Sequence, residues 1–267
     1  MEQYRFLMIG AHPDDMELRC GGLAMRLREK GHQVMFLSMT DGSAGHHQMD
    51  SESLAARRCE EAQAAGRTLG IMVKIMPIAD GHLEADVKTR EMLIREIRAF
   101  APHVILTHRA VDYHPDHRAC GQLVMDCAYL INVPLFCPDA PCPNLAPVIL
   151  SAWDHFKKPL PFVPDIAVPV DDLVERKIDA VLCHVSQFYE WLAFIEGWTP
   201  VLEATTFEEK TAWLRDWLRE RFAGEAKLYP QLIPEGVRFA ETFEWNEYGA
   251  PLTDELRRVM TDISAGQ

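Results

Sequence analysis

Positive charge is scarce in this sequence, which disfavours a polyanionic partner. Lysine and arginine total 27 residues against 40 aspartates and glutamates, so the formal net charge is −13. Nucleic-acid binding requires a clustered basic surface, and the sequence has no such cluster. It also has no apolar run long enough to span a bilayer and no stretch built like a signal peptide. We therefore expect a cytoplasmic protein with no nucleic-acid partner and no membrane span.

The sequence also lacks the patterns of a disulfide framework, a zinc knuckle and a dinucleotide-binding loop. The seven cysteines are scattered and odd in number, and most lie in apolar segments, which is typical of reduced, buried thiols. Cys137 and Cys142 lie in CPDAPC, but their spacing is not that of a zinc knuckle. The first apolar run is followed by GAHPDD instead of G-x-G-x-x-G, so a dinucleotide-binding loop is disfavoured.

Apolar runs alternate with helix-like segments through the first half of the chain. The predicted strands are 6–9, 33–38, 71–78 and 104–107, and the predicted helices are 16–30, 53–69, 87–100 and one from Pro115 to about residue 129. This alternation predicts an α/β fold, Rossmann-like, with a mostly parallel sheet and helices on both faces. No repeat or linker interrupts residues 1–267, so we expect a single domain with a core of about 1–200 and a C-terminal elaboration of about 201–267.

The second half is less regular. Residues 132–147 hold five prolines and two cysteines, which predicts an irregular segment that serves as a lid or an oligomer contact. Pro169 makes residues 166–170 an edge strand. We expect helices from residue 171 to about 197 and over 207–221, and a late strand or loop at 238–248. The aromatic residues of 188–198 form either core or an exposed patch; a patch would be a subunit interface, and we expect a homo-oligomer.

Two short polar stretches follow the first and fourth predicted strands. The first offers His12, Asp14 and Asp15, and the second offers His114, Asp116 and His117. Carboxyl ends of parallel strands meet at one edge of a sheet, where ligand sites gather. Clustered carboxylates are costly to bury unless a cation joins them.

This combination of residues is that of a catalytic metal site. Two imidazoles and one carboxylate form the ligand set of catalytic zinc sites, which leave a position open for water. The remaining groups are then available as general base and as acid or oxyanion stabiliser. Spacing alone does not decide which of Asp14 and Asp15 binds the metal. Taken singly, an HxxH pair or two carboxylates at a helix start is usually structural; their occurrence at corresponding strand ends favours a site.

These motifs resemble the PIG-L/LmbE family of zinc-dependent N-deacetylases. The resemblance rests on Ala11–Asp15 with Gly21-Gly22 behind it, and on His114–His117. Weaker matches are Arg58 and Glu61 on one helix, the turn Asp80-Gly81, and Ser186-Gln187. Together they span about the first two hundred residues.

The resemblance implies a role for each matching residue. His12, Asp15 and His117 are implied to hold Zn²⁺, although an N/O ligand set also accepts another divalent ion such as Fe²⁺. Asp14 is implied to be the general base and His114 the oxyanion stabiliser and acid. Asp116 is implied to orient an imidazole, and Arg58 and Asp80 to bind substrate. The implied reaction removes the N-acetyl group from an acetamido sugar or sugar conjugate.

The sequence departs from the commonest family pattern in two places. Met16 replaces a frequent glutamate, with Glu17 one position later, and Arg19 stands where glycine is common. These differences concern the surroundings of the ligands, and hence the substrate. One alternative is an amidase acting on a larger N-acyl or thiol conjugate. Another is a non-catalytic metal- or ligand-binding Rossmann-like module, which would need neither Asp14 nor His114.

Several residues carry a structural alternative. Arg58 lies on an Arg/Glu-rich helix and is equally well interpreted as a solvated residue, and Asp80 before glycine suits a simple turn. We expect His46 and His47 to be surface residues, and His184 to be a satisfied histidine of the core.

Overall fold

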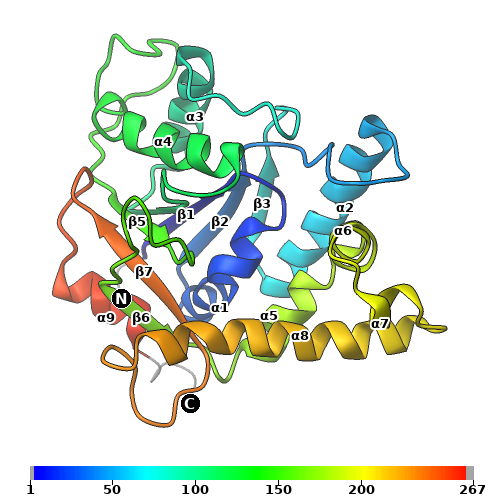
Figure 1. Ribbon diagram of the computed structural model, residues 1–267. Coiled ribbons are helices and arrows are strands. Elements are labelled where there is room, and N and C mark those ends of the chain that lie inside the picture. The colour runs from blue at the N-terminus through cyan, green and yellow to red at the C-terminus, as the bar shows by residue number, and fades with distance from the viewer. Residues whose placement is uncertain (1–2, 263–267) are drawn as a thin grey trace.

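The computed structural model describes residues 3–262, and its central feature is a seven-stranded sheet (Figure 1). The strands are β1 (Arg5–Gly10), β2 (Gln33–Ser38), β3 (Met72–Ile75), β4 (Val104–Thr107), β5 (Val148–Ala152), β6 (Ile166–Pro169) and β7 (Ala240–Asn246). Their order is β3-β2-β1-β4-β5-β7-β6. The first five strands are parallel, and β7 is antiparallel to both of its neighbours. The predicted α/β class with a mostly parallel sheet is confirmed.

The central strands are apolar on both sides because helices cover both faces of the sheet. In β1, Phe6 and Met8 face one core, and Leu7 and Ile9 face the other. The first core contacts α1 (Asp15–Glu29), α2 (Ser51–Leu69), α5 (Val174–Val181) and α8 (Phe207–Leu228). The second contacts α3 (Val87–Phe100) and α4 (Pro115–Leu130), which lie on the opposite face in Figure 1.

Several predicted elements are confirmed to within two residues, and local capping explains their ends. The α2 helix begins at Ser51 because the Asp50 side chain accepts a hydrogen bond from the Ser53 amide. It ends at Gly70, whose φ of 73° closes the last turn. The third strand is shorter than predicted, since pairing with β2 covers only Met72–Ile75.

The single helix predicted over residues 171 to about 197 is wrong. The chain instead forms α5, a π-helical turn η1 (Ser186–Trp191) and α6 (Leu192–Ile195), separated by a break at residues 182–185. Glu61 of α2 accepts hydrogen bonds from the Ser186 amide (2.9 Å) and hydroxyl (2.6 Å). This carboxylate satisfies the first donors of the new helix, so the break is stabilised from another element.

The C-terminal part supplies a strand inside the sheet. After α7 (Thr199–Leu202), the α8 helix runs seven residues beyond its predicted end to Leu228, and β7 then inserts between β5 and β6. The late strand is thereby confirmed, as is the edge position of β6. A final helix, α9 (Asp254–Thr261), has no counterpart among the predicted elements.

Residues 132–147 contain no helix or strand, as predicted. The lid interpretation is wrong, because this segment leads from the end of α4 to the start of β5, at the edge where the parallel strands begin. The polar stretches after β1 and β4 lie at the opposite edge. Two hydrogen bonds between Asn132 and Leu145 (2.6 and 2.8 Å) close the segment on itself.

The aromatic stretch divides between core and surface. Phe188 and Tyr189 are buried, whereas Phe194 is 51% exposed. Homo-oligomer formation through these residues stays a prediction. No helix within residues 3–262 is both long and apolar enough to cross a membrane.

Candidate metal centre

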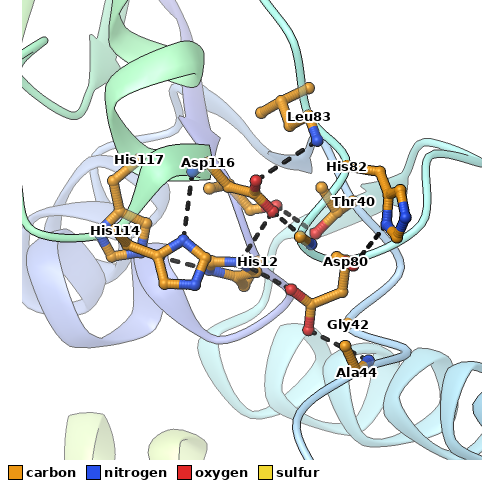
Figure 2. Close-up of polar contacts among 12 residues, drawn as sticks. His12, Thr40, Gly42, Ala44, Asp80, His82, Leu83, His114, Asp116 and His117 are labelled. Atoms are coloured by element: carbon orange, nitrogen blue, oxygen red, sulfur yellow. Dashed lines mark hydrogen bonds and ion pairs between the residues drawn. The ribbon is translucent and has the colours of Figure 1, made fainter.

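The predicted site residues meet at the carboxyl edge of the sheet. His12, Asp14 and Asp15 follow β1 directly, and Asp15 begins α1. On the neighbouring segment, His114 is the N-cap of α4 and its Nδ1 accepts from the Asp116 amide (3.2 Å). Pro115 occupies the first helical position, where its missing amide costs nothing. The cap places His117 one turn into α4, beside His12 (Figure 2).

Two ring nitrogens and a carboxylate converge in this cluster. His117 Nε2 lies 3.2 Å from His12 Nδ1. Asp15 faces both rings, with Oδ2 3.5 Å from His12 Nδ1 and Oδ1 3.3 Å from His117 Nε2. Two zinc–nitrogen bonds of about 2.05 Å at the tetrahedral angle separate the nitrogens by about 3.3 Å. The arrangement of these three side chains therefore fits one small divalent cation.

The outer nitrogen of each imidazole faces carboxylates. His12 Nε2 lies 3.2 Å from Asp80 Oδ1 and 3.4 Å from Asp116 Oδ2 (Figure 2). His117 Nδ1 lies 3.1 Å from Asp112 Oδ1. A carboxylate behind each ring fixes the tautomer that turns the inner lone pair toward a metal. This second layer of contacts is the observation that best supports metal binding.

The carboxylates also change the basicity of the two rings. Burial lowers the pKa of His12, but the nearby carboxylates of Asp116, Asp15 and Asp80 outweigh burial and raise it well above the ordinary value. Burial likewise opposes protonation of His117, yet Asp15 and Asp112 raise its pKa to about 9. Protons and a metal ion therefore compete for these nitrogens.

The Asp15 carboxylate has two further polar neighbours. Its Oδ2 accepts from the His12 amide (2.7 Å), and His108 Nε2 lies 3.0 Å from the same oxygen. Burial raises the pKa of Asp15, but the nearby His117 and His108 outweigh it and hold that pKa well below the usual range. The carboxylate is therefore ionised, as a metal ligand must be.

Asp14 points to a different neighbour. Its Oδ1 accepts from Arg58 Nη2 (3.1 Å), while Arg58 Nη1 donates to the Gly42 carbonyl (3.2 Å). Gly42 has a φ of +70°, and a Cβ there would lie 2.8 Å from Arg58 Cδ. Glycine is thus required for this loop to pass over the arginine. The two adjacent aspartates have separate surroundings, one facing the histidines and the other the guanidinium.

Two site residues predicted with structural alternatives lie within the cluster. Arg58 is only 2% exposed, so its interpretation as a solvated residue is wrong. Asp80 does more than shape a turn, because Oδ1 faces His12 and Oδ2 accepts from the Ala44 amide (3.3 Å). Both residues contact other site residues, and their contacts with substrate stay predictions.

The remaining histidines differ in their surroundings. The His46 side chain is buried and its Nε2 lies 2.9 Å from Glu190 Oε2, so its expected surface position is wrong; His47 is exposed, as expected. His184 is fully buried, which confirms its core position. Neither of its ring nitrogens has a hydrogen-bond partner within residues 3–262, so the expectation that it is satisfied is wrong; its Nε2 lies 3.4 Å from Glu17 Oε1. The carboxylate shifted by one residue relative to the common family pattern thus pairs with this histidine.

Two contributors to the cluster were missed in the sequence. His108 follows β4 directly, so its position at a carboxyl strand end was a usable signal. Asp112 gave no signal apart from lying near His114, because loop geometry alone turns it toward His117. Three overlapping groups of His and Asp in residues 3–262 have metal-binding geometry: His12 with His114 and His117; Asp15 with His108 and His117; and His12 with Asp80 and Asp116.

Comparison with known proteins identifies the family. The family described as "PIG-L: GlcNAc-PI de-N-acetylase" matches residues 7–128. A diacetylchitobiose deacetylase from Thermococcus kodakarensis is 30% identical over 210 residues, which cover 74% of each chain. The chain belongs to this family.

Two further similar proteins have names that refer to different reactions. An N,N'-diacetylchitobiose deacetylase structure from Pyrococcus horikoshii superposes with a TM-score of 0.71 at 24% identity, covering 92% of this chain and 85% of that chain. A 4-oxalmesaconate hydratase from Pseudomonas putida is 24% identical, covering 69% of this chain and 74% of that protein. The family name alone therefore does not fix the reaction, which has to be argued from the site.

Proposed function

We propose that this protein is a metal-dependent hydrolase that removes the N-acetyl group from an acetamido sugar or sugar conjugate. The observation that carries the proposal is the presence of two spare groups, Asp14 and His114, beside a complete three-ligand set. A site that only bound metal would need the ligands but neither a base nor an acid. The deacetylase from Thermococcus kodakarensis supports the same reaction class.

In this proposal His12, Asp15 and His117 hold the ion. A divalent cation bound there supplies Lewis acidity, which lowers the pKa of a water molecule and polarises the acetyl carbonyl. Zinc is the expected ion because its tetrahedral sites use this ligand set, and Fe²⁺ is the alternative. Asp116 and Asp80 keep the His12 ring in place, and Asp112 does so for His117.

Asp14 is the proposed general base. Arg58 binds its Oδ1, while its Oδ2 accepts no hydrogen bond from the part of the chain that the structure describes. Oδ2 is therefore free to take the proton from the attacking water as its oxygen adds to the acetyl carbon. Arg58 fixes the direction in which that oxygen points.

His114 is the proposed oxyanion stabiliser, and protonated Asp14 is the acid for the departing amine. Because its Nδ1 accepts from the Asp116 amide, the proton of the neutral ring resides on Nε2. Burial and the neighbouring His12 lower the pKa of His114, which keeps the ring neutral at pH 7. Nε2–H donates to the carbonyl oxygen as negative charge develops, and the proton held by Asp14 then passes to the departing amine, which releases acetate.

Acetate release from a panel of N-acetylated sugars tests the proposal. Zinc-loaded protein should release acetate from at least one N-acetylglucosamine conjugate and should lose this activity with chelator. If a longer acyl group leaves faster than acetate, the amidase alternative holds. Metal-loaded protein that hydrolyses no amide, but hydrates 4-oxalmesaconate, would place the chain with its hydratase relative. No turnover of any kind would favour the binding module.

A further inference from the structure

A second concave region adjoins the metal centre. A cavity of about 340 Å³ lies between the loop after β4 and the loop after β5, with Asp112, Tyr113, Arg118, Phe156 and Lys158 in its wall. The Tyr113 ring links the two regions, because its centroid lies 5.7 Å from that of His114 and 6.0 Å from that of Phe156. A substrate whose acetyl group reaches the metal centre can therefore extend into this cavity.

The cavity wall carries positive charge without counter-ions. No carboxylate within residues 3–262 forms an ion pair with Arg118 or Lys158, and both side chains are exposed. Arg118 uses Nη1 to donate to the carbonyls of Asp112 and Tyr113 (2.8 and 2.9 Å), which leaves the rest of its guanidinium available.

The acidic residue of the wall does not neutralise these cations. Asp112 has a side chain only 3% exposed, with Oδ1 turned to His117 and to the His114 amide (3.0 Å). The Asp112 carboxylate therefore faces the histidines of the metal centre. In a protein with a net charge of −13, the cavity is therefore locally cationic.

Aromatic rings supply the apolar part of the wall. Tyr113 is 69% exposed although it is a large aromatic residue, and Phe156 lies beside it. Ring faces of this kind pack against the C–H surface of a small ligand, and polar groups at their edge fix its orientation. The volume is at the lower end for small-molecule sites, sufficient for one sugar-sized group.

We propose that this cavity binds the part of the substrate beyond the acetamido sugar, and that this part carries a carboxylate or phosphate held by Lys158 and Arg118. The inference rests on the proposed deacetylase function and narrows its substrate class to acidic conjugates of an acetamido sugar. Lys158 and Arg118 line the cavity and belong neither to the proposed metal ligands nor to the acid–base groups, so they act on substrate binding: loss of either charge raises KM more than it lowers kcat.

The experiment compares an acidic with a neutral probe. Acetate release is measured with N-acetylglucosamine 1-phosphate and with the methyl glycoside of N-acetylglucosamine, for wild type, Lys158→Ala and Lys158→Glu. Wild type should favour the phosphate, and Lys158→Ala should raise its KM about tenfold, the effect of losing one charge-assisted hydrogen bond. The KM of the methyl glycoside should change much less than that of the phosphate, and Lys158→Glu should reverse the preference. Lys157→Ala, which removes the neighbouring exposed lysine, is the matched control and should behave as wild type.

Calorimetric binding of the same two probes separates the two proposals. If no probe is deacetylated, but the phosphate binds more tightly than the methyl glycoside and this difference requires Lys158, the proposed reaction fails and the subsite stands. If acetate is released and wild type treats the probes alike, or if Lys158→Ala retains the full preference for the phosphate, the subsite is overturned while the reaction stands. Absence of any Lys158-dependent binding also overturns the subsite.

Discussion

At the scale of single residues, the cluster is defined by carboxylates that face the outer nitrogens of the histidines. Asp112→Asn should weaken metal binding by about 10- to 100-fold, because His117 loses the negative partner that orients it and raises its basicity. Competition with a chromogenic chelator measures this loss. Asp126→Asn on α4, the helix that carries His117, is the control: its carboxylate binds Arg90, and the substitution should leave metal affinity unchanged. Unchanged affinity in Asp112→Asn would remove Asp112 from the metal centre.

Asp14 and Asp15 are adjacent, yet their substitutions should have different effects. Asp14→Asn should retain the metal and lose about 10²- to 10⁴-fold in kcat, the usual contribution of a general base. Asp15→Asn should lose metal and activity together. Metal content by atomic emission and kcat for acetate release distinguish the two outcomes. An active Asp14→Asn enzyme would exclude Asp14 as the base.

The site residues near strand ends could be identified from the sequence. Those that depend on the path of a loop to reach the site could not. His12 and Asp15 follow β1 directly, and His114 and His117 lie at the start of the helix that follows β4, so parallel topology was enough to bring them together. Asp112 and the burial of Arg58 depend on the path of loops and on the close passage of Gly42, which no local pattern records. Residue type and spacing did not decide which of Asp14 and Asp15 binds the metal. In the structure the two aspartates have different neighbours, which supports separate roles.

At the scale of elements, α4 carries His117, one of the three proposed metal ligands, and must approach the loop after β4 closely. A Cβ on Gly121 would lie 2.6 Å from the His108 carbonyl oxygen and 2.8 Å from the Arg109 carbonyl carbon, both backbone atoms. Gly121→Ala should therefore displace α4 and destabilise the protein by about 1–3 kcal/mol, with loss of metal affinity. Chemical denaturation and chelator competition measure both effects.

Gly224 in α8 provides the matched control for this substitution. Nothing lies within 4 Å of a Cβ at this position, so Gly224→Ala should be neutral or stabilise by up to about 1 kcal/mol through helix propensity. Equal stability of Gly121→Ala and Gly224→Ala would contradict the close approach of α4.

Elements whose ends are set locally were predictable, and those set by distant residues were not. Asp50 and Gly70 mark both ends of α2 in the sequence itself. The break before η1 depends on Glu61, which is 125 residues from Ser186, so apolar periodicity through residues 171–197 predicted one continuous helix. The lid interpretation of residues 132–147 failed because composition does not reveal at which edge of the sheet a segment lies.

At the scale of the whole molecule, a buried ionic cluster joins α1, α5, α8 and β7. Glu241 accepts from the Gly22 and Leu23 amides (both 2.8 Å) and from Lys177 (2.7 Å). Glu225 accepts from the Thr242 amide and hydroxyl (2.8 and 2.9 Å) and is otherwise deeply buried. Burial raises the pKa of Glu225 from 4.5 to about 7.

This shift predicts a specific dependence of stability on pH. Between about pH 4.5 and 7 the folded protein keeps a proton on Glu225 that the unfolded chain has released, so the free energy of unfolding falls as pH rises through this range. Glutamine is neutral at every pH. Above pH 7 the free energy of unfolding of Glu225→Gln should therefore exceed that of wild type by about 1–3 kcal/mol, and near pH 4.5 the two should differ little. Denaturant melts at several pH values test this.

Glu220→Gln is the control on the same helix, because Glu220 is exposed. It should follow the pH profile of wild type. A Glu225→Gln profile parallel to that of wild type would show that Glu225 does not titrate in this range.

The insertion of β7 between β5 and β6 has a consequence for synthesis on the ribosome. The β6 strand pairs only with β7, so residues 166–169 have no strand partner until residues 240–246 have emerged. The loop from β5 to β6 carries Phe156 and Lys158. Until β7 has emerged, the β6 end of this loop is not held in the sheet. Residues of the metal centre are translated first, whereas the cationic cavity beside it is completed only when the last strand of the chain takes its place.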